Sequence, residues 1–358
     1  MDGKEETIGT KLTYIIPCYN AGTRLSKCVD SILQQGVSEF EIIIINDGSD
    51  EETSKIAEAQ KSKSQNIIVI NQENSGACVA RNNGIDKATG YYIMFVDADD
   101  TLEPQSVGRL VRNAEDNALP DLVISGYNII EGERKQTTML AAHDYGQNDL
   151  RKAFLRLCDD LAFSSPWLKL YKKSVIKKKH IRFTDGMRDF EDYVFNCLVW
   201  EHINSVMTSD IVTYNYYMNS DSLSHVFCVD SLVSDFKQYV ESGHRIVESL
   251  SHDKEELDYG KECVNMAFAK ILRAKVRLLY NTKSQNKIND LKTIVSLGKD
   301  LLGDAEFRKT YGSIGMTSKL EALLMKHLRM LDIAERCIHK AKKAAVRLFT
   351  QREARRTL

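Results

Sequence analysis

The chain has 358 residues and a formal net charge of −1, so it carries no overall charge that would attract nucleic acid. Its eight cysteines are scattered without a C-x-x-C pair, which favours reduced thiols over a disulfide framework or a zinc site. The polar N-terminus is unlike a signal peptide and no 18-residue apolar run occurs, so we expect a cytoplasmic protein.

The first hundred residues alternate between apolar runs and helical stripes. We predict strands at 12–16, 41–45, 67–70 and 91–96, with helices over 25–33, 50–61 and 77–88. Pro17 is expected to end the first strand, Ser49 and Glu52 have the spacing of a capping box, and Gly90 stands where a helix C-terminal cap would lie. This order of elements predicts an α/β fold with a doubly wound, mainly parallel sheet.

Polar clusters follow each of these strands. They are Pro17–Asn20, Asn46–Ser49, Asn71–Gly76 and Asp97–Asp100. Ligands of doubly wound sheets bind beyond the carboxyl ends of the strands, so the clusters predict one binding site. No dinucleotide-binding or P-loop glycine motif is present. The carboxylates of Asp97 and Asp99 suit Mg²⁺ or Mn²⁺, which would bridge to a phosphorylated ligand, and Arg81 adds a fixed cation.

Four motifs together carry a family resemblance over about the first 105 residues. They are Tyr14-Ile15-Ile16-Pro17-Cys18-Tyr19-Asn20, Ile45-Asn46-Asp47-Gly48-Ser49, Asn74-Ser75-Gly76 with Ala80-Arg81-Asn82, and Phe95-Val96-Asp97-Ala98-Asp99-Asp100. In order and spacing they resemble the family 2 glycosyltransferases of the GT-A fold. The resemblance implies an inverting transferase that uses a nucleotide-diphosphate sugar and a divalent metal.

The resemblance also implies roles for single residues. Those that would contact the donor nucleotide are Pro17, Tyr19, Asn20, Asp47, Arg81, Asp97 and Ala98. Tyr19 would stack on the base, Asp47 would accept the uracil N–H, and Asp97 would contact the ribose. Asp99 would ligate Mn²⁺ or Mg²⁺. The alternatives are a turn role for Asp47, an ion pair with a surface carboxylate for Arg81, and a purely local structural role for Asp100.

The middle of the chain supplies candidates for the acceptor side. We predict a strand over 121–130 and a hairpin or lid over 131–147. A W-x-K-L-Y segment follows, in which Trp167 could face a sugar ring or fill the core, and Lys169 could meet a phosphate or extend from the surface.

The pair Glu191-Asp192 resembles the family's E-D-x-x-F/W signature. Inverting transfer needs a base for the acceptor hydroxyl, and the resemblance makes Asp192 the leading candidate and Glu191 the second. The alternative is that the pair only begins a helix. His225 could reach the metal or diphosphate, or be structural.

The last third of the chain has a helical pattern. We predict three regions: residues 1–110 as the nucleotide-sugar half of a GT-A domain, 111–228 as the acceptor and catalytic half, and 229–358 as a helical region. From residue 326 onward the sequence forms a basic amphipathic segment that could lie on an anionic inner membrane or against a partner, or pack on the domain.

The sequence therefore predicts a metal-dependent inverting glycosyltransferase. It would move a sugar, with UDP-sugar as the expected donor, to a glycan or lipid-linked glycan in bacterial cell-surface polysaccharide synthesis, without a nucleic-acid partner. Two alternatives stay open: a catalytically inactive sugar-nucleotide-binding or assembly subunit, and a sugar-nucleotide pyrophosphorylase. The expected location is cytoplasmic, with peripheral contact to the cytoplasmic face of the membrane and homo-oligomer formation as further possibilities.

Overall fold

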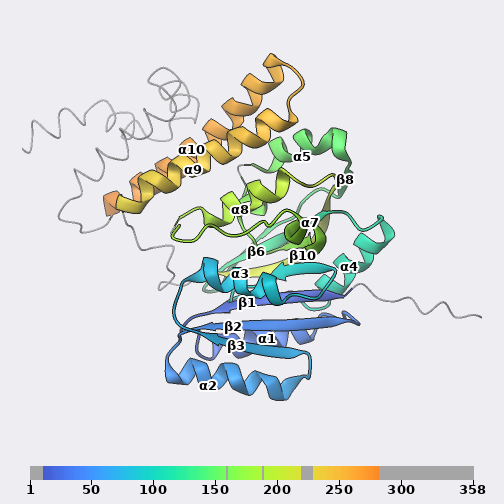
Figure 1. Cartoon of the computed structure of the whole chain (residues 1–358), viewed down its shortest axis with the longest axis vertical. Coiled ribbons are helices and arrows are strands. Elements are labelled where there is room, and N and C mark those ends of the chain that lie inside the picture. The colour runs from blue at the N-terminus through green and yellow to red at the C-terminus, as the bar shows by residue number, and fades with distance from the viewer. Residues whose placement is uncertain (1–10, 159, 188, 219–228, 282–358) are drawn as a thin grey trace, which may run out of the picture. The chain divides into compact units, whose positions relative to one another are not determined.

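The structure is a computed structural model that describes residues 11–158, 160–187, 189–218 and 229–281, all within one compact unit (Figure 1). His225 and the basic segment 326–358 lie outside the described residues, so their roles stay predictions. Within the described ranges, none of the helices combines the length and the apolar character that a membrane span requires.

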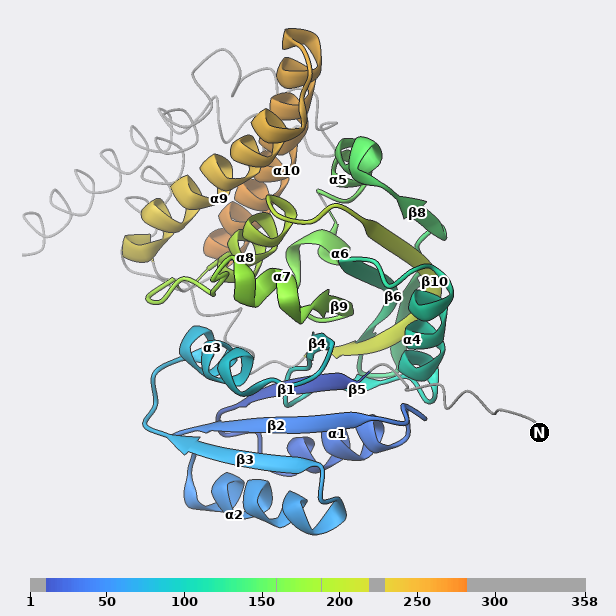
Figure 2. The same ribbon diagram turned by 45° about the vertical axis from the view of Figure 1, so that its right-hand side comes forward.

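The first half of the fold follows the predicted alternation of strands and helices. Its elements are β1 (Leu12–Cys18), α1 (Arg24–Leu33), β2 (Phe40–Asp47), α2 (Glu51–Gln60), a 3₁₀ turn (Lys61–Lys63), β3 (Ile67–Gln72), α3 (Ala77–Lys87) and β4 (Tyr92–Phe95). The strands run parallel in the order β3-β2-β1-β4, as Figure 2 shows. Because β4 lies on the other side of β1 from β2 and β3, right-handed crossovers place α3 on the opposite face from α1 and α2. The predicted doubly wound fold is confirmed.

The second half extends the same sheet with strands of both directions. Its elements are β5 (Thr101–Leu102), α4 (Ser106–Asp116), β6 (Leu122–Glu131), β7 (Arg134–Thr138), β8 (His143–Tyr145), a 3₁₀ turn (Gln147–Asp149), α5 (Leu150–Leu157), α6 (Leu161–Ser164), β9 (Lys169–Lys172), α7 (Lys173–Lys178), α8 (Glu191–Trp200), β10 (Val206–Tyr217), α9 (Val229–Leu250) and α10 (Lys254–Asn281). The ten-stranded sheet of the described residues has the order β3-β2-β1-β4-β9-β6-β10-β5, with β7 on β6 and β8 on β10.

Strand β9 changes the direction of the sheet. It is antiparallel to both β4 and β6, whereas β6 and β10 are parallel to each other. The parallel arrangement is therefore continuous only through the first half, and the whole sheet is mixed. The predicted hairpin within 131–147 is confirmed by the antiparallel pairing of β6 with β7. The predicted division after residue 110 falls inside α4.

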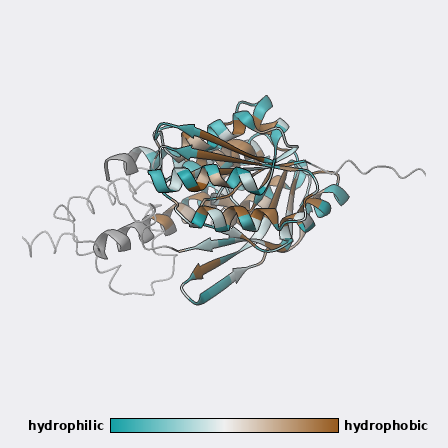
Figure 3. Cartoon of the chain, turned by 90° about the horizontal axis from the view of Figure 1, so that it is seen from below, coloured by the Kyte–Doolittle hydropathy of each residue, from teal (hydrophilic) through white to brown (hydrophobic). Residues whose placement is uncertain are grey.

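The core lies along the central strands. Ile42 to Ile45 of β2 are fully buried, which matches a parallel strand covered by helices on both faces. Figure 3 shows the hydrophobic residues concentrated along the strands. The continuous β-branched run of β2 is thus explained by burial on two sides, and the sheet provides a rigid base for the residues at its carboxyl edge.

Pro17 does not end β1, contrary to the prediction. It lies inside the strand, opposite Ile45 of β2, while the pairing with β4 stops at Ile15. The carbonyl of Ile15 accepts from the N–H of Val96, so residues 15 and 17 direct their backbone groups toward the β4 side. The missing N–H of Pro17 therefore falls where no partner strand remains, and the ladder loses nothing.

The predicted helix caps at Gly90 and Ser49 were also wrong. Gly90 has no left-handed backbone; instead, a Cβ there would lie 2.7 Å from the backbone nitrogen of Thr13, so glycine permits close approach to β1. The cap of α2 is Asp50, whose carboxylate accepts from the N–H of Thr53 at 2.7 Å. Ser49 instead donates its hydroxyl to the carbonyl of Cys18.

Candidate active site

The candidate site is built from three elements of the carboxyl edge of the sheet and one later helix. Strand β2 ends at Asp47, β4 leads into Asp97, and α3 carries Arg81. Helix α8 begins with Glu191 and Asp192. The structure therefore brings together residues that the sequence separates by about a hundred positions.

Arg81 is the centre of this arrangement. Its guanidinium lies 2.9 Å from the Asp192 carboxylate, 3.1 Å from that of Asp97 and 3.6 Å from that of Glu191. The arginine is buried, with 5% of its surface exposed, and its charge is offset by these carboxylates. The alternative of an ion pair is thus confirmed in part: Arg81 does pair with carboxylates, but the arginine is buried and its several acidic partners belong to both halves of the site.

Burial shapes the protonation of the acidic pair on α8. It raises the pKa of Asp192 to about 6, and Arg81 opposes that rise. Burial, and after it the charge of the neighbouring Asp192, together raise the pKa of Glu191 to about 8. Near neutral pH the pair therefore holds one proton, with Asp192 the ionised member. Two adjacent carboxyl groups with different protonation states suit proton transfer.

The start of α8 is fixed by helix α9. Phe190, which precedes Glu191, has a left-handed backbone with φ of 67°. That conformation is unfavourable for a bulky residue and is maintained by packing of its ring against Phe236 and Tyr239, at centroid distances of 5.0 and 5.3 Å. Since the turn at Phe190 sets where the next two side chains point, α9 contributes to the geometry of the site.

The acidic residues after β4 point to different partners. Asp97 meets Arg81, and Asp99 lies 3.8 Å from the guanidinium of Arg24. Asp100 is buried and accepts from the Tyr214 hydroxyl at 2.8 Å and from the Tyr217 N–H at 2.9 Å. Burial raises the pKa of Asp100 well above its usual range. Asp100 thus ties β10 to the turn, which is a structural role but a long-range one, in contrast to the purely local role that the sequence left open.

Asp47 is held by the loop that follows β3. Its carboxylate accepts from the Gln72 side chain at 2.7 Å and from the N–H groups of Ser75 and Gly76 at 2.8 and 2.9 Å. Gly48 allows this loop to come close, because a Cβ there would lie 2.6 Å from the backbone nitrogen of Asn74. A carboxylate offers about four acceptor positions, so these three hydrogen bonds leave one unfilled.

The remaining predicted nucleotide contacts differ in exposure. Tyr19 is 51% exposed, so its ring is free to stack on a base, and it follows Pro17 and the last residue of β1. Asn20 accepts from the N–H of Asp50 at 2.8 Å, and this bond holds the loop to the start of α2. Ala98 is buried between Asp97 and Asp99. These positions line the same edge as Asp47.

The W-x-K segment is inside the protein. Trp167 is buried and stacks on Tyr214 and Tyr216, with centroid distances of 4.5 and 5.5 Å, so the core interpretation is confirmed. Both predicted roles of Lys169 were wrong, because its side chain is fully buried and reaches neither solvent nor the donor edge. Its ammonium donates to the carbonyls of Phe163 and Ser165.

Sequence reasoning missed the buried contacts that support the site. Tyr214 of β10 accepts from the backbone N–H of Asp97 at 3.0 Å, a contact that the sequence analysis did not predict. The alternation of positions 214 and 216 on one face of a strand was the available signal. For Asn196, which donates to the carbonyl of Asp192 at 2.9 Å, its place one turn after Asp192 was the signal.

The carboxylate oxygens at this edge are suitable ligands for a hard divalent cation that a substrate also helps to hold. In the described part of the chain, no three His, Cys, Asp or Glu side chains converge as a self-contained metal site. Asp99 lies at the same edge as Asp97, with 36% of its side chain exposed, and it offers carboxylate oxygens as ligands. Mg²⁺ is commonly bound by one or two carboxylates together with substrate phosphates, so this arrangement suits such an ion.

The sequence of the chain matches a known family. Residues 13–179 match the profile of Glycosyl transferase family 2. The N-terminal part of the chain is therefore similar to the glycosyltransferases of this family. Over 218 residues it is 32% identical to EpsJ, an uncharacterized glycosyltransferase of Bacillus subtilis strain 168; the match covers 60% of this chain and 63% of EpsJ. The family 2 match spans β1 to α7, so α8 with its acidic pair lies beyond it.

Solved structures share the fold of this chain. The structure of Staphylococcus aureus TarS residues 1–349 with UDP-GlcNAc superposes with a TM-score of 0.57 at 19% identity, covering 84% of this chain and 92% of that one. The mannosyltransferase PcManGT of Pyrobaculum calidifontis, solved with GDP-Man and Mn²⁺, gives a TM-score of 0.51 at 14% identity and covers 85% and 84%. The GT-A fold is thereby confirmed.

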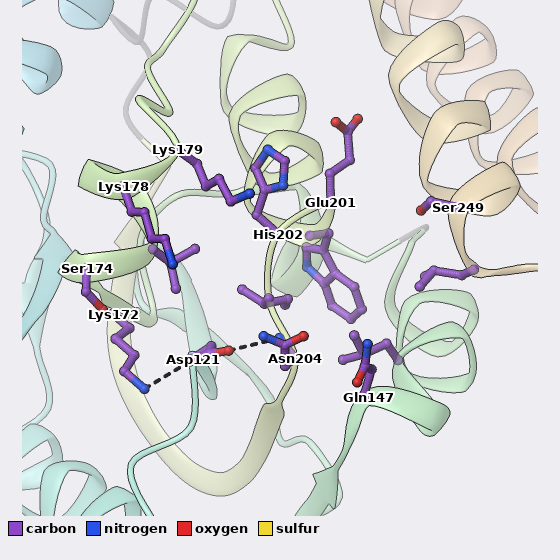
Figure 4. A pocket seen from close by; sticks show the side chains of 15 residues that line it. Asp121, Gln147, Lys172, Ser174, Lys178, Lys179, Glu201, His202, Asn204 and Ser249 are labelled. Atoms are coloured by element: carbon purple, nitrogen blue, oxygen red, sulfur yellow. Dashed lines mark hydrogen bonds and ion pairs between the residues drawn. The ribbon is translucent and has the colours of Figure 1, made fainter.

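A separate cavity of about 700 Å³ lies at the other end of the sheet. It is lined at its base by Asp121, which lies 3.0 Å from the ammonium of Lys172 and accepts from the N–H of Asn204 at 2.9 Å (Figure 4). Asp121 and Asn204 precede β6 and β10, so the cavity is at the amino ends of these strands. It is therefore distinct from the carboxylate site.

Proposed function

We propose that this protein is a metal-dependent inverting glycosyltransferase that uses a nucleotide-diphosphate sugar, with UDP-sugar as the expected donor. The acceptor would be a hydroxyl of a glycan or lipid-linked glycan in bacterial cell-surface polysaccharide synthesis, as the family resemblance implies. The observation that carries the proposal is the contact of Arg81 with both Asp97 and Asp192, because it sets a base candidate beside the residues expected to hold the donor.

In this mechanism Asp192 removes the proton of the acceptor hydroxyl. The hydroxyl oxygen forms a bond to the anomeric carbon of the donor while the bond from that carbon to the diphosphate breaks, so the configuration inverts in one step. The proton goes to Asp192 and the electron pair leaves with the nucleoside diphosphate. Arg81 keeps the Asp192 carboxylate ionised and oriented through the contact of 2.9 Å.

The donor side depends on Tyr19, Asp47 and the carboxylates after β4. Tyr19 stacks on the base, and Asp47 accepts a base N–H with its remaining acceptor position. Asp99, with phosphate oxygens of the donor, would hold Mn²⁺ or Mg²⁺. When bound, such an ion supplies positive charge to the leaving diphosphate. The UDP-GlcNAc in the TarS structure supports a UDP-sugar as the donor, and the Mn²⁺ in the PcManGT structure supports a divalent cation.

The protonation of Asp192 sets the acid limit of the reaction. A base must be ionised, and the pKa of Asp192 is raised to about 6 by burial. Below that pH the carboxyl becomes protonated, so we expect the transfer rate to fall about tenfold for each further pH unit. Steady-state rates between pH 5 and 8 with saturating donor would measure this; a rate that stays level down to pH 5 would contradict the assignment.

The function is tested by a screen of nucleotide sugars with and without Mn²⁺. We expect UDP-sugars to raise the melting temperature only with the ion, and GDP-sugars to have a smaller effect. The variant Asp99→Asn should lose the ion-dependent stabilisation and the turnover. Asp100→Asn is the matched control, because this buried carboxyl faces Tyr214 and Tyr217 and should leave the ion effect intact.

Three outcomes would contradict the proposal. Turnover of Asp99→Asn at the wild-type rate would remove the metal role of that residue. Tighter binding of GDP-sugars than of UDP-sugars would change the donor. Binding of donors without transfer to any glycan hydroxyl and without donor hydrolysis would favour a sugar-nucleotide-binding subunit.

A further inference from the structure

Lys169 is a buried cation that the proposed mechanism does not use. It is the first residue of β9, and its side chain is fully buried. Transferring an ammonium group out of water is costly unless hydrogen bonds and opposite charges compensate. A neutral side chain of the same length would avoid this cost, so the placement of the charge requires a physical explanation.

The ammonium of Lys169 is bound by the end of helix α6. It donates to the carbonyl of Phe163 at 3.2 Å and also to that of Ser165. Ser165 is the residue at which α6 ends, and carbonyl groups at a helix end lack partners within the helix. Lysine is suited to this position because it can donate several hydrogen bonds from one atom.

The same carbonyl connects Lys169 with the helix that carries the base. The amide of Asn196, in α8, donates to the carbonyl of Ser165 at 3.1 Å and to that of Asp192 at 2.9 Å. The oxygen of that amide accepts from the hydroxyl of Tyr171, two residues after Lys169 on the same strand, at 2.7 Å. Strand β9, the end of α6 and the first turn of α8 therefore share one buried hydrogen-bond network.

Charged groups of two elements act on Lys169. Asp192 on α8 and Asp160 at the start of α6 favour its protonated form, whereas burial is the largest effect and lowers its pKa to about 7. Arg81 on α3 is the other cation that acts on Asp192, and Glu191 is the neighbouring acid. Lys169 in turn lowers the pKa of Asp192, so the two groups stabilise each other's charged forms near pH 6.

We propose that Lys169 is a positioning residue for sugar transfer: it holds the end of α6 against the first turn of α8 and places a second buried positive charge near Asp192. This inference rests on the proposed function, since it assigns Asp192 the role of base. Arg81 orients the Asp192 carboxylate by a direct ion pair. Lys169 acts on the backbone of Asp192 indirectly, because Lys169 and Asn196 both donate to the carbonyl of Ser165 and Asn196 also donates to the carbonyl of Asp192.

The test follows the titration of Asp192 directly. Aspartate labelled with ¹³C at the carboxyl carbon allows the pKa of Asp192 to be read by NMR, with its signal identified by its loss in Asp192→Asn. In Lys169→Met we expect this pKa to rise by about one pH unit, the size expected when a nearby buried cation is removed. The acid limit of the transfer rate should move upward equally, and the donor KM should stay within about twofold.

Two further variants separate the charge from the hydrogen bonds. Lys169→Gln keeps a donor for the carbonyls but no charge, so it should show the same rise in the pKa of Asp192, and it replaces Lys169→Met if that variant does not fold. Tyr171→Phe removes a neutral hydrogen bond of the same network and should leave the titration of Asp192 in place.

An unchanged titration of Asp192 in a folded Lys169 variant would overturn the inference, and so would an equal rise in Tyr171→Phe. A wild-type protein that transfers no sugar would overturn the proposed function alone, because the titration is measured without turnover.

Discussion

The two halves of the sheet hold their functional carboxylates in different ways. Asp47, in the parallel half, is bound by neutral donors of the neighbouring loop, including the N–H groups of Ser75 and Gly76. Asp192, in the mixed half, has Arg81 of the other half as its ion-pair partner. The first carboxylate is therefore supported locally, whereas the second depends on a contact between the halves.

This difference shows how the fold divides its tasks. Neutral backbone donors hold a carboxylate in place without a competing charge. An arginine, in contrast, fixes the charge state of a base and its direction together. We infer that recognition of the base of the donor and activation of the acceptor are controlled separately, and variants of each half should show different defects.

The largest expected effect is on catalysis and comes from Asp192→Asn. This change keeps the shape of the side chain and removes the base, so we expect the transfer rate to fall about 10²- to 10⁴-fold while the affinity for UDP stays the same. Calorimetric titration with UDP and a transfer assay measure the two quantities. A rate close to that of the wild type would assign the base role to Glu191 or to neither residue.

The next effect is on folding and comes from Arg81→Met. Removing the cation leaves Asp97 and Asp192 without their buried partner, which should cost about 3–5 kcal/mol of unfolding free energy. Urea denaturation measures it, and the double variant Arg81→Met with Asp192→Asn should recover part of the loss. Arg24→Met is the control: its pair with Asp99 is at 3.8 Å and partly exposed, so the cost should be below about 1 kcal/mol.

Asp47→Asn should affect donor recognition alone. Asparagine cannot accept from Gln72, Ser75 and Gly76 at once, and it changes the charge offered to the base, so we expect UDP affinity to fall about 10- to 100-fold. With saturating donor the transfer rate should stay near that of the wild type, in contrast to Asp192→Asn. Equal loss of rate and affinity would show that the halves are not independent.

The smallest expected effect is a pH-dependent gain in stability from Glu191→Gln. The folded pKa of Glu191 is raised to about 8, above its usual value, so the folded state binds a proton more strongly than the unfolded state. The stability from that proton is present at low pH and is lost as the pH rises toward 8. Glutamine removes this loss, so the variant should gain stability relative to the wild type as the pH rises from 5 to 8.5. A constant difference across this range would contradict it.

The sequence predicted the parallel half almost completely. Strands buried on both faces have a distinctive apolar pattern, and the polar residues at their ends, such as Asp47 and Asp97, are adjacent to these patterns. The predictions for Pro17 and Gly90 were wrong because residue preferences for strand ends and helix caps contain no information about which strand lies beside the residue. A proline is tolerated where a partner strand has ended, and a glycine can serve close packing in place of a turn.

The mixed half was less predictable because its structure depends on distant contacts. Strand β9 has four residues and lies between β4 and β6, which no local pattern indicates. The burial of Lys169 contradicts the ordinary preference of lysine for the surface, and only the end of α6 makes it possible. The motif Glu191-Asp192 was recognised by resemblance, but its contact with Arg81 was not predicted.

The contact between Arg81 and Asp192 joins residues 111 positions apart, and this distance matters during synthesis of the protein. A chain emerges from the ribosome with its N-terminal part first, so the elements of the parallel half are available before α8 exists. The carboxylate that we propose as the base is added afterwards. Under that proposal a nascent chain gains its donor-side residues before its base, and long-range contacts of this kind are also the slowest to form.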